Sequence, residues 1–258
     1  MEGTMNKILF FILLVGINSQ AFATDVATME EFVNAAKNSE DIVLTEDLTA
    51  PSDYNATLTY GDFSIDGNNH TIYGGDQTTQ FIRNMGGSIN EIKNITFDGF
   101  VNQVIPKDED GNVLDQDDNM GAVITNQGRI EKIDGIFKNN QAYHGAAIFN
   151  GSNKYIGSIN GTFTGNKSET YSDKVYTEAS GAAIHNQGHI GNITGTFENN
   201  TAQMAGTIWN YGTIDNITAT FKNNHRSAVG GNYGTVTITN SLFYQNDTTG
   251  RLYYWTGN

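Results

Sequence analysis

The chain has 258 residues, a formal charge of −14 at pH 7 and no cysteine. The missing cysteines exclude a disulfide scaffold and a thiolate metal site, and the negative charge opposes general binding to the phosphate backbone of nucleic acids. The composition, with 29 Gly, 32 Asn and only 2 Pro, favours many short strands joined by tight turns.

Residues 1–23 have the pattern of a secretory signal peptide. Lys7 precedes the apolar run 8–17, and Ala21-Phe22-Ala23 fits the small-x-small rule, so we expect cleavage after Ala23. A transmembrane anchor is the alternative, but the run is shorter than the roughly 20 residues that span a bilayer. No later segment reads as a membrane helix. We therefore expect a chain that is secreted or held at a bacterial cell surface.

Residues 24–60 are predicted to form an N-terminal cap. Thr28 and Glu31 have the spacing of a capping box, and an apolar stripe follows, which together predict a helix over 28–38. A strand is expected over 41–49. Next along the chain, two short strands should flank the turn Gly67-Asn68-Asn69 within 63–74.

From residue 61 to 250 the chain repeats itself with gaps that lie mostly near 24 residues. Each unit carries apolar residues in alternation, which is typical of half-buried strands. A single unit of this length cannot bury its own Ile and Phe side chains, so copies must stack, and the prediction is an all-β, single-stranded parallel β-helix. An acidic insertion, 107–118, and a C-terminal tail, 251–258, stand outside the repeats.

Stacked units should place equivalent side chains in continuous ladders. Two such structural ladders are predicted, and their members are Phe137, Phe163, Phe197, Phe221 and Phe243 for the first, and Asn126, Asn150, Asn186, Asn210 and Asn232 for the second. The Asn-Asn pairs at 139–140, 199–200 and 223–224 suit left-handed turns after the Phe strand.

At these residues the sequence resembles the pectin-lyase-like right-handed parallel β-helix superfamily. Two motifs carry a narrower resemblance, to passenger regions of chlamydial-type polymorphic outer-membrane proteins, which are autotransporters. The first is GGA(I/L/V), present in variant form at 121–124, 145–148 and 181–184, and the second is FxxN, present from Phe137 to Phe243. The resemblance implies a surface-exposed adhesin with outer-membrane association. Such proteins end in a membrane β-barrel, so the chain is expected to be either a fragment or a passenger without its own translocator.

The side chains capable of chemistry also have structural interpretations. The insertion 107–118 has oxygen-rich residues but not the EF-hand spacing, which favours a solvated loop over a Ca²⁺ site. The acids of the repeats are scattered singly, whereas glycoside hydrolysis needs two carboxylates at a defined separation. His144, His185, His189 and His225 are interpreted as surface residues.

Two outward columns are predicted on one wall. Their members are Ile136, Thr162, Thr196 and Thr220 in one column and Asp134, Asn160, Thr194 and Thr218 in the other. Ice binding by such a Thr array is an alternative to ordinary strand propensity.

The sequence therefore assigns no catalytic residue, cofactor or metal. It predicts an exported, non-catalytic interaction module that binds a surface glycan or a protein through polar walls, with exposed tyrosines such as Tyr211 and Tyr233 contributing. No nucleic-acid partner is expected. The alternative function is that of a secreted polysaccharide lyase or hydrolase on the same scaffold.

Overall fold

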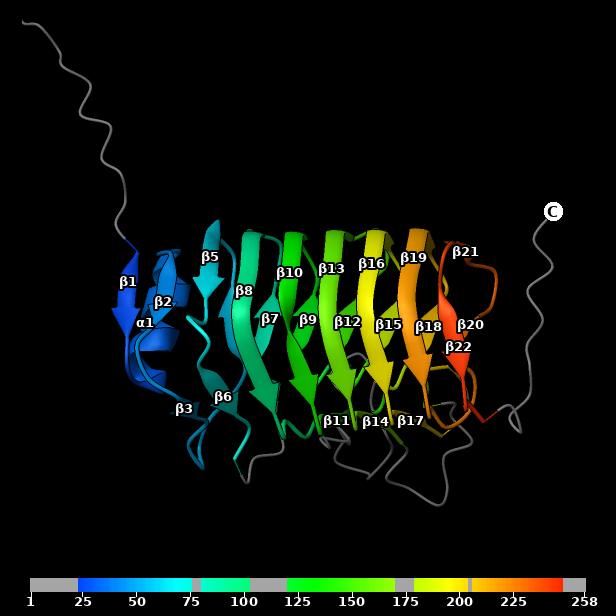
Figure 1. The fold of residues 1–258 in the computed structure, drawn as a ribbon. Coiled ribbons are helices and arrows are strands. Elements are labelled where there is room, and N and C mark those ends of the chain that lie inside the picture. Colours follow the sequence, from blue (N-terminus) through cyan, green and yellow to red (C-terminus); the bar gives the residue numbers. More distant parts are fainter. Residues whose placement is uncertain (1–22, 76–79, 103–119, 170–178, 204–205, 248–258) are drawn as a thin grey trace, which may run out of the picture.

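A computed structural model describes residues 23–75, 80–102, 120–169, 179–203 and 206–247. The signal segment except Ala23, the acidic insertion 107–118 and the tail 251–258 lie outside these ranges. The described part forms a right-handed parallel β-helix with one short helix at its N-terminal end (Figure 1). The predicted fold class is thereby confirmed.

The N-terminal cap consists of α1 (Met29–Asn38) and three short strands, β1 (Thr24–Val26), β2 (Ile42–Leu44) and β3 (Leu48–Thr49). The Thr28 hydroxyl accepts a hydrogen bond from the Glu31 amide, and the Glu31 carboxylate accepts one from the Thr28 amide. This capping box fixes where the helix begins. The strand expected over 41–49 is divided into β2 and β3.

Three parallel sheets build the faces of the helix. The long sheet continues from the cap through β5 (Phe63–Asp66), β6 (Thr71–Tyr73), β8 (Ser88–Asp98), β10 (Arg129–Lys138), β13 (Tyr155–Thr164), β16 (His189–Glu198), β19 (Thr213–Lys222), β21 (Thr235–Ile238) and β22 (Leu242–Tyr244). The seven-stranded sheet comprises β4 (Thr57–Thr59), β7 (Ile82–Asn84), β9 (Ile124–Asn126), β12 (Ile148–Asn150), β15 (Ile184–Asn186), β18 (Ile208–Asn210) and β20 (Val229–Gly231). The smallest sheet contains β11 (Gln141–Ala142), β14 (Lys167–Ser168) and β17 (Thr201–Ala202).

The register of the long strands places residues of the same type directly above one another in successive coils. Phe137 pairs with Phe163, and Phe163 pairs with Phe197. The rings of Phe163 and Phe197 are parallel, with centroids 4.7 Å apart, and Phe221 and Phe243 extend the stack at separations of 4.8 and 4.9 Å. All five predicted Phe residues therefore lie in one file.

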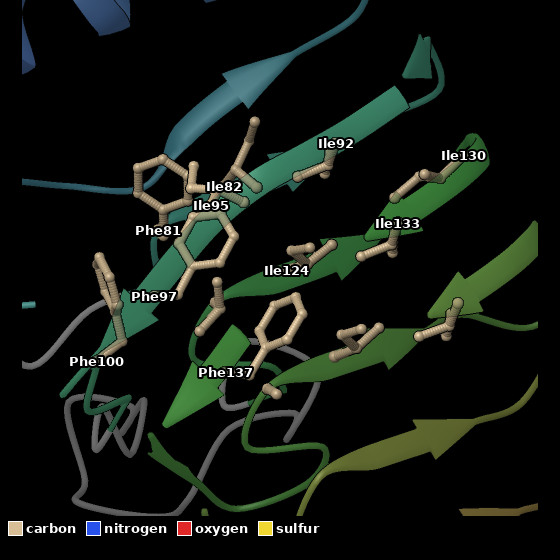
Figure 2. Packing of buried hydrophobic residues seen from close by; sticks show 14 of the residues in the cluster. Phe81, Ile82, Ile92, Ile95, Phe97, Phe100, Ile124, Ile130, Ile133 and Phe137 are labelled. Atoms are coloured by element: carbon tan, nitrogen blue, oxygen red, sulfur yellow. The ribbon is translucent and has the colours of Figure 1, made fainter. Parts of the chain in front are cut away.

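The stack widens into a larger apolar core towards the N-terminal end. Figure 2 shows the rings of Phe97 and Phe137 inside the coil, surrounded by isoleucines from neighbouring strands. Phe32 of α1 contacts Phe81 at 4.9 Å between ring centroids. The helix thus buries its apolar face against the first turns of the solenoid, which closes this end of the core.

A ladder of asparagine side chains runs along the seven-stranded sheet. Asn126 Nδ2 donates to Asn150 Oδ1 at 2.8 Å, and the same contact joins Asn150 to Asn186 and Asn186 to Asn210. Each side chain also bonds main-chain carbonyls at the corner, for example Asn126 to Tyr155 O. The ladder therefore satisfies polar groups that the coil has removed from water.

The two ends of this ladder differ from the prediction. It begins at Asn84, which donates to Asn126 Oδ1 and was not among the predicted members. It does not include Asn232, because the register pairs Asn210 with Gly231 and leaves Asn232 exposed. In the last repeat, Val-Gly-Gly-Asn stands where earlier repeats have Ile-x-Asn, so the Asn comes one residue too late.

A second asparagine ladder runs beside the Phe stack, and the sequence analysis does not predict it. It contains the last residue of each FxxN motif, Asn140, Asn166, Asn200, Asn224 and Asn246. The residue before each of these asparagines has a positive, left-handed φ, which is 57° at both Asn139 and Asn199. In each Asn-Asn pair, the first residue therefore makes the predicted turn and the second is buried in the ladder.

Candidate binding surface

The long sheet carries a groove along its outer face. Its volume is about 340 Å³ and it crosses four strands, β8, β10, β13 and β16. Since adjacent strands lie about 4.8 Å apart, the groove extends for about 14 Å along the solenoid axis. Its lining residues are Asn69, Asn94, Ile95, Thr96, Asp134, Gly135, Ile136, Asn160, Gly161, Thr162, Gly195 and Thr196.

Two ridges of outward side chains border the groove, and they are the two columns that the sequence predicts. One contains Asp134, Asn160 and Thr194, and the other contains Ile136, Thr162 and Thr196. The alternation of residues along the strands predicts the two ridges, but it does not predict that the surface between them forms a groove.

Glycines form the floor between the ridges. At Gly161 a Cβ atom would lie 2.8 Å from Gly135 O and 2.9 Å from a ring carbon of Phe163. A larger residue would therefore collide with the neighbouring coil and with the Phe stack. At Gly161 the packing of the core therefore requires glycine, whereas Ile95 and Ala219 occupy the equivalent position at the two ends of this column.

The two ridges offer different hydrogen-bonding groups. Asn160 Nδ2 donates to Asp134 Oδ1 at 3.1 Å, and Thr194 Oγ1 donates to Asn160 Oδ1 at 3.0 Å, so the first ridge is held in place by its own bonds. The hydroxyls of Thr162 and Thr196 make no hydrogen bond to any described residue. The second ridge can therefore donate to and accept from a ligand.

The lysines of the long sheet are paired with carboxylates across the coils. Lys132 Nζ lies 2.8 Å from Glu91 Oε1, and Lys222 Nζ lies 2.7 Å from Glu198 Oε1. Hydrogen bonds from Lys132, and after it Lys93, lower the pKa of the Glu91 carboxyl. Asp134 is the one carboxylate among the groove-lining residues, and no lysine or arginine is among them. This set lacks the two carboxylates of a glycoside hydrolase.

The four histidines of the repeats that the sequence analysis names fall into two groups, which corrects the interpretation that all of them are surface residues. His189 and His225 are exposed and lie 2.9 and 3.0 Å from Asp215 and Asp247. His185 lies on β15, on the side of the strand opposite the inward-facing Ile184, and His144 lies beside it in the coil before. Their ring centroids are 4.6 Å apart, so the offset between coils brings together two residues that lie far apart in the sequence.

The imidazole rings of His144 and His185 lie within hydrogen-bonding distance of the same hydroxyl group, that of Ser180. Ser180 Oγ lies 3.1 Å from His144 Nδ1 and 3.3 Å from His185 Nδ1. Burial lowers the pKa of His144 to about 4 and lowers that of His185 well below its ordinary value. Both rings are therefore neutral at pH 7, and their contacts with Phe149 and Tyr143 give them a packing role.

The tyrosines proposed from the sequence do not reach the groove. Tyr211 follows β18 and packs edge-on against Trp209 at 5.7 Å, and Tyr233 follows β20 and is 92% exposed. An aromatic side chain on the long sheet, Tyr155, is covered by the Arg129 guanidinium at 4.0 Å. The groove lining therefore combines amide, hydroxyl and carboxylate groups with the apolar side chains of Ile95 and Ile136, and no aromatic ring is among the lining residues.

The described residues contain neither a cluster of metal ligands nor a membrane-spanning helix. Within the ranges given above, no three His, Asp or Glu side chains gather in a way that could hold a metal ion. No helix in that part of the chain has the length and apolar character needed to cross a membrane.

Comparison with known proteins gives one match. A family model described as "Putative pectate lyase-like adhesive domain" matches residues 23–122, which span the cap and the first turns of the solenoid. The match and the parallel sheets both fit a pectin-lyase-like β-helix. No curated protein and no solved structure matches the chain. The word adhesive in this description suggests binding to a partner.

Proposed function

We propose that this protein is a non-catalytic adhesive module that acts outside the cell and binds a neutral glycan in the groove of the long sheet. The observation that carries the proposal is the pair of ridges across β10, β13 and β16, with Asp134, Asn160 and Thr194 on one side and the unpaired hydroxyls of Thr162 and Thr196 on the other. The family match to an adhesive domain supports it.

The charge of the chain indicates which glycans fit. With a net charge of −14 and its long-sheet lysines paired, the protein repels polyanions such as uronic-acid polymers. Sugar hydroxyls, by contrast, can both donate to and accept from Thr162, Thr196 and Asn160. A neutral polysaccharide chain lying along the solenoid axis uses the full length of the groove.

The finer assignments rest on sequence motifs. The apolar run before Ala23 supports export, and the GGA(I/L/V) and FxxN repeats support display at a bacterial surface as in autotransporter passengers. N-terminal sequencing of exported protein tests the leader: a mature chain that begins at Thr24 is expected, and an uncleaved Met1 would contradict it.

Binding is tested with immobilised neutral and acidic polysaccharides and with two variants. Thr162→Val plus Thr196→Val removes the unpaired hydroxyls while keeping β-branched side chains, and binding to the neutral polymer should fall. Thr164→Val, on the same strand but outside the groove lining, is the matched control and should bind like the parent. Equal binding by the parent and the groove variant would refute the site, and release of new reducing ends would favour a lyase or hydrolase.

A further inference from the structure

The groove of the long sheet does not present the same side chains along its whole length. On β13 and β16, one ridge presents the hydroxyls of Thr162 and Thr196. On β10, the same ridge presents Ile136, which is 43% exposed. The register places Ile136 between Thr96 of β8 and Thr162 of β13, so a single aliphatic side chain interrupts a column of threonines in the groove. These four strands lie side by side in Figure 1.

Asp134 stands on the other ridge at the same coil. It is separated from Ile136 by Gly135 alone, so both side chains point to the outer face of β10. Their Cα atoms are about 6.6 Å apart, because a strand rises by about 3.3 Å per residue. A ligand that lies in the groove at β10 therefore meets a carboxylate on one side and an aliphatic side chain on the other.

The hydrogen bonds of its ridge hold the Asp134 carboxylate in one orientation. Thr194 Oγ1 donates to Asn160 Oδ1, and Asn160 Nδ2 donates to Asp134 Oδ1. The series of donors thus ends on Asp134. Within the described ranges, no hydrogen bond reaches the second carboxylate oxygen, Asp134 Oδ2. This oxygen is a positioned acceptor that is open to an N–H or O–H group of a ligand.

We propose that the β10 end of the groove recognises a 2-acetamido sugar, so that the ligand is a neutral glycan containing N-acetylhexosamine. The acetamido N–H donates to Asp134 Oδ2, and the acetamido methyl group packs against Ile136. Neighbouring sugars lie over β13 and β16, where their hydroxyls pair with Thr162 and Thr196. This inference rests on the proposed binding of a neutral glycan in the groove.

Other substituents of a sugar match this pair of side chains less well. A plain hexose brings only hydroxyls to Ile136, and the methyl group of a 6-deoxy sugar has no attached donor for Asp134. The ammonium of an amino sugar suits Asp134 but is costly to desolvate against an aliphatic side chain. A uronic acid brings a second carboxylate into a chain of net charge −14. An acetamido group joins an N–H donor and a methyl group in one neutral unit.

The test compares two oligosaccharides with the same β-1,4-linked backbone, the tetramer of N-acetylglucosamine and the tetramer of glucose. They differ only in the acetamido group that takes the place of the 2-hydroxyl. Calorimetric titration of the full chain should give a dissociation constant about tenfold lower for the N-acetylated tetramer, because one hydrogen bond to a charged acceptor and one methyl contact are added.

Two variants assign this preference to the β10 pair. Ile136→Thr introduces the residue that the column carries on both sides, and Asp134→Asn keeps the shape of the side chain but replaces one acceptor oxygen with a donor. Each should weaken binding of the N-acetylated tetramer about fivefold and leave the glucose tetramer unaffected. Leu58→Thr is the matched control, because it removes a 39% exposed aliphatic side chain from the seven-stranded sheet, and it should change neither affinity.

The outcomes separate this inference from glycan binding itself. Equal affinity of the parent for both tetramers, lowered by Thr162→Val plus Thr196→Val, would overturn acetamido recognition and leave glycan binding in place. Tighter binding of the glucosamine tetramer would also overturn it, since Asp134 would then bind an ammonium group. Binding of neither tetramer would contradict the inference, and it would contradict glycan binding as well only if no neutral polysaccharide is retained.

Discussion

Acidification should destabilise this protein through the buried imidazole pair. In the unfolded chain His144 has a pKa near 6.5, and burial lowers the pKa to about 4 in the fold. Because the folded pKa is depressed, the unfolded state binds more protons between these values. Stability is therefore full above pH 6.5 and is lost as the pH falls towards 4.

The pKa of His144 sets the size of the effect. A change from 6.5 to about 4 corresponds to about 3 kcal/mol. His185 acts in the same direction, since its pKa is also lowered, first by burial and then by the nearby His144. The loss is a large fraction of the ~5–15 kcal/mol that stabilises a typical domain.

Urea denaturation at pH 7.5, 5.5 and 4.0 measures this loss, with variants to separate it from carboxylate protonation. The double variant His144→Met, His185→Phe uses residues found at paired positions, Met120 and Phe149. It should lose less stability than the parent between pH 7.5 and 4.0, by about 3 kcal/mol or more. His189→Asn, at an exposed site, should behave as the parent does. Identical pH profiles for parent and double variant would refute the reasoning.

Three substitutions test the ladders by urea denaturation. Phe197→Ala removes the middle ring of the buried stack and should cost about 3–5 kcal/mol, whereas Phe243→Ala, at the half-exposed end, should cost clearly less; equal costs would show that stacking is not the cause. Asn186→Ala breaks the first asparagine ladder in its middle and should cost about 1–3 kcal/mol, because Asn150 and Asn210 lose a partner. Thr59→Asn should raise stability by about 1 kcal/mol, since it offers a donor to Asn84 Oδ1, which has no partner at the start of that ladder; a lower midpoint would contradict this account.

The solenoid could be predicted from the sequence because its repeats place one residue type at one position. The Phe file and the inner members of the first asparagine ladder follow from spacing alone. The cap helix follows from Thr28 and Glu31, which act locally. Such features depend on neighbours in the sequence or on a fixed period, and both are visible in a single chain.

Other features depend on three-dimensional offsets that a period does not show. Asn232 matches the ladder in letters but lies one residue out of register. The second Asn of each pair reads as a turn residue, although its side chain is buried under the coil. His144 and His185 meet only because the corner between coils brings them together, and their burial cannot be read from composition.

The groove illustrates the same limit. Its two ridges are visible in the sequence as outward columns, but spacing does not show that Gly135, Gly161 and Gly195 line a groove between them. In the repeats these glycines look like ordinary strand interruptions. Only the contact between Gly161 and the Phe163 ring shows that the core beneath excludes any larger side chain there.

The most direct test of the adhesive function is an amide chemical-shift titration of the labelled protein with a neutral polysaccharide. Binding in the groove predicts that the largest changes fall on β10, β13 and β16 around Ile136, Thr162 and Thr196, while the polymer keeps its length. Changes centred on the seven-stranded sheet, or shortening of the polymer during the titration, would contradict it.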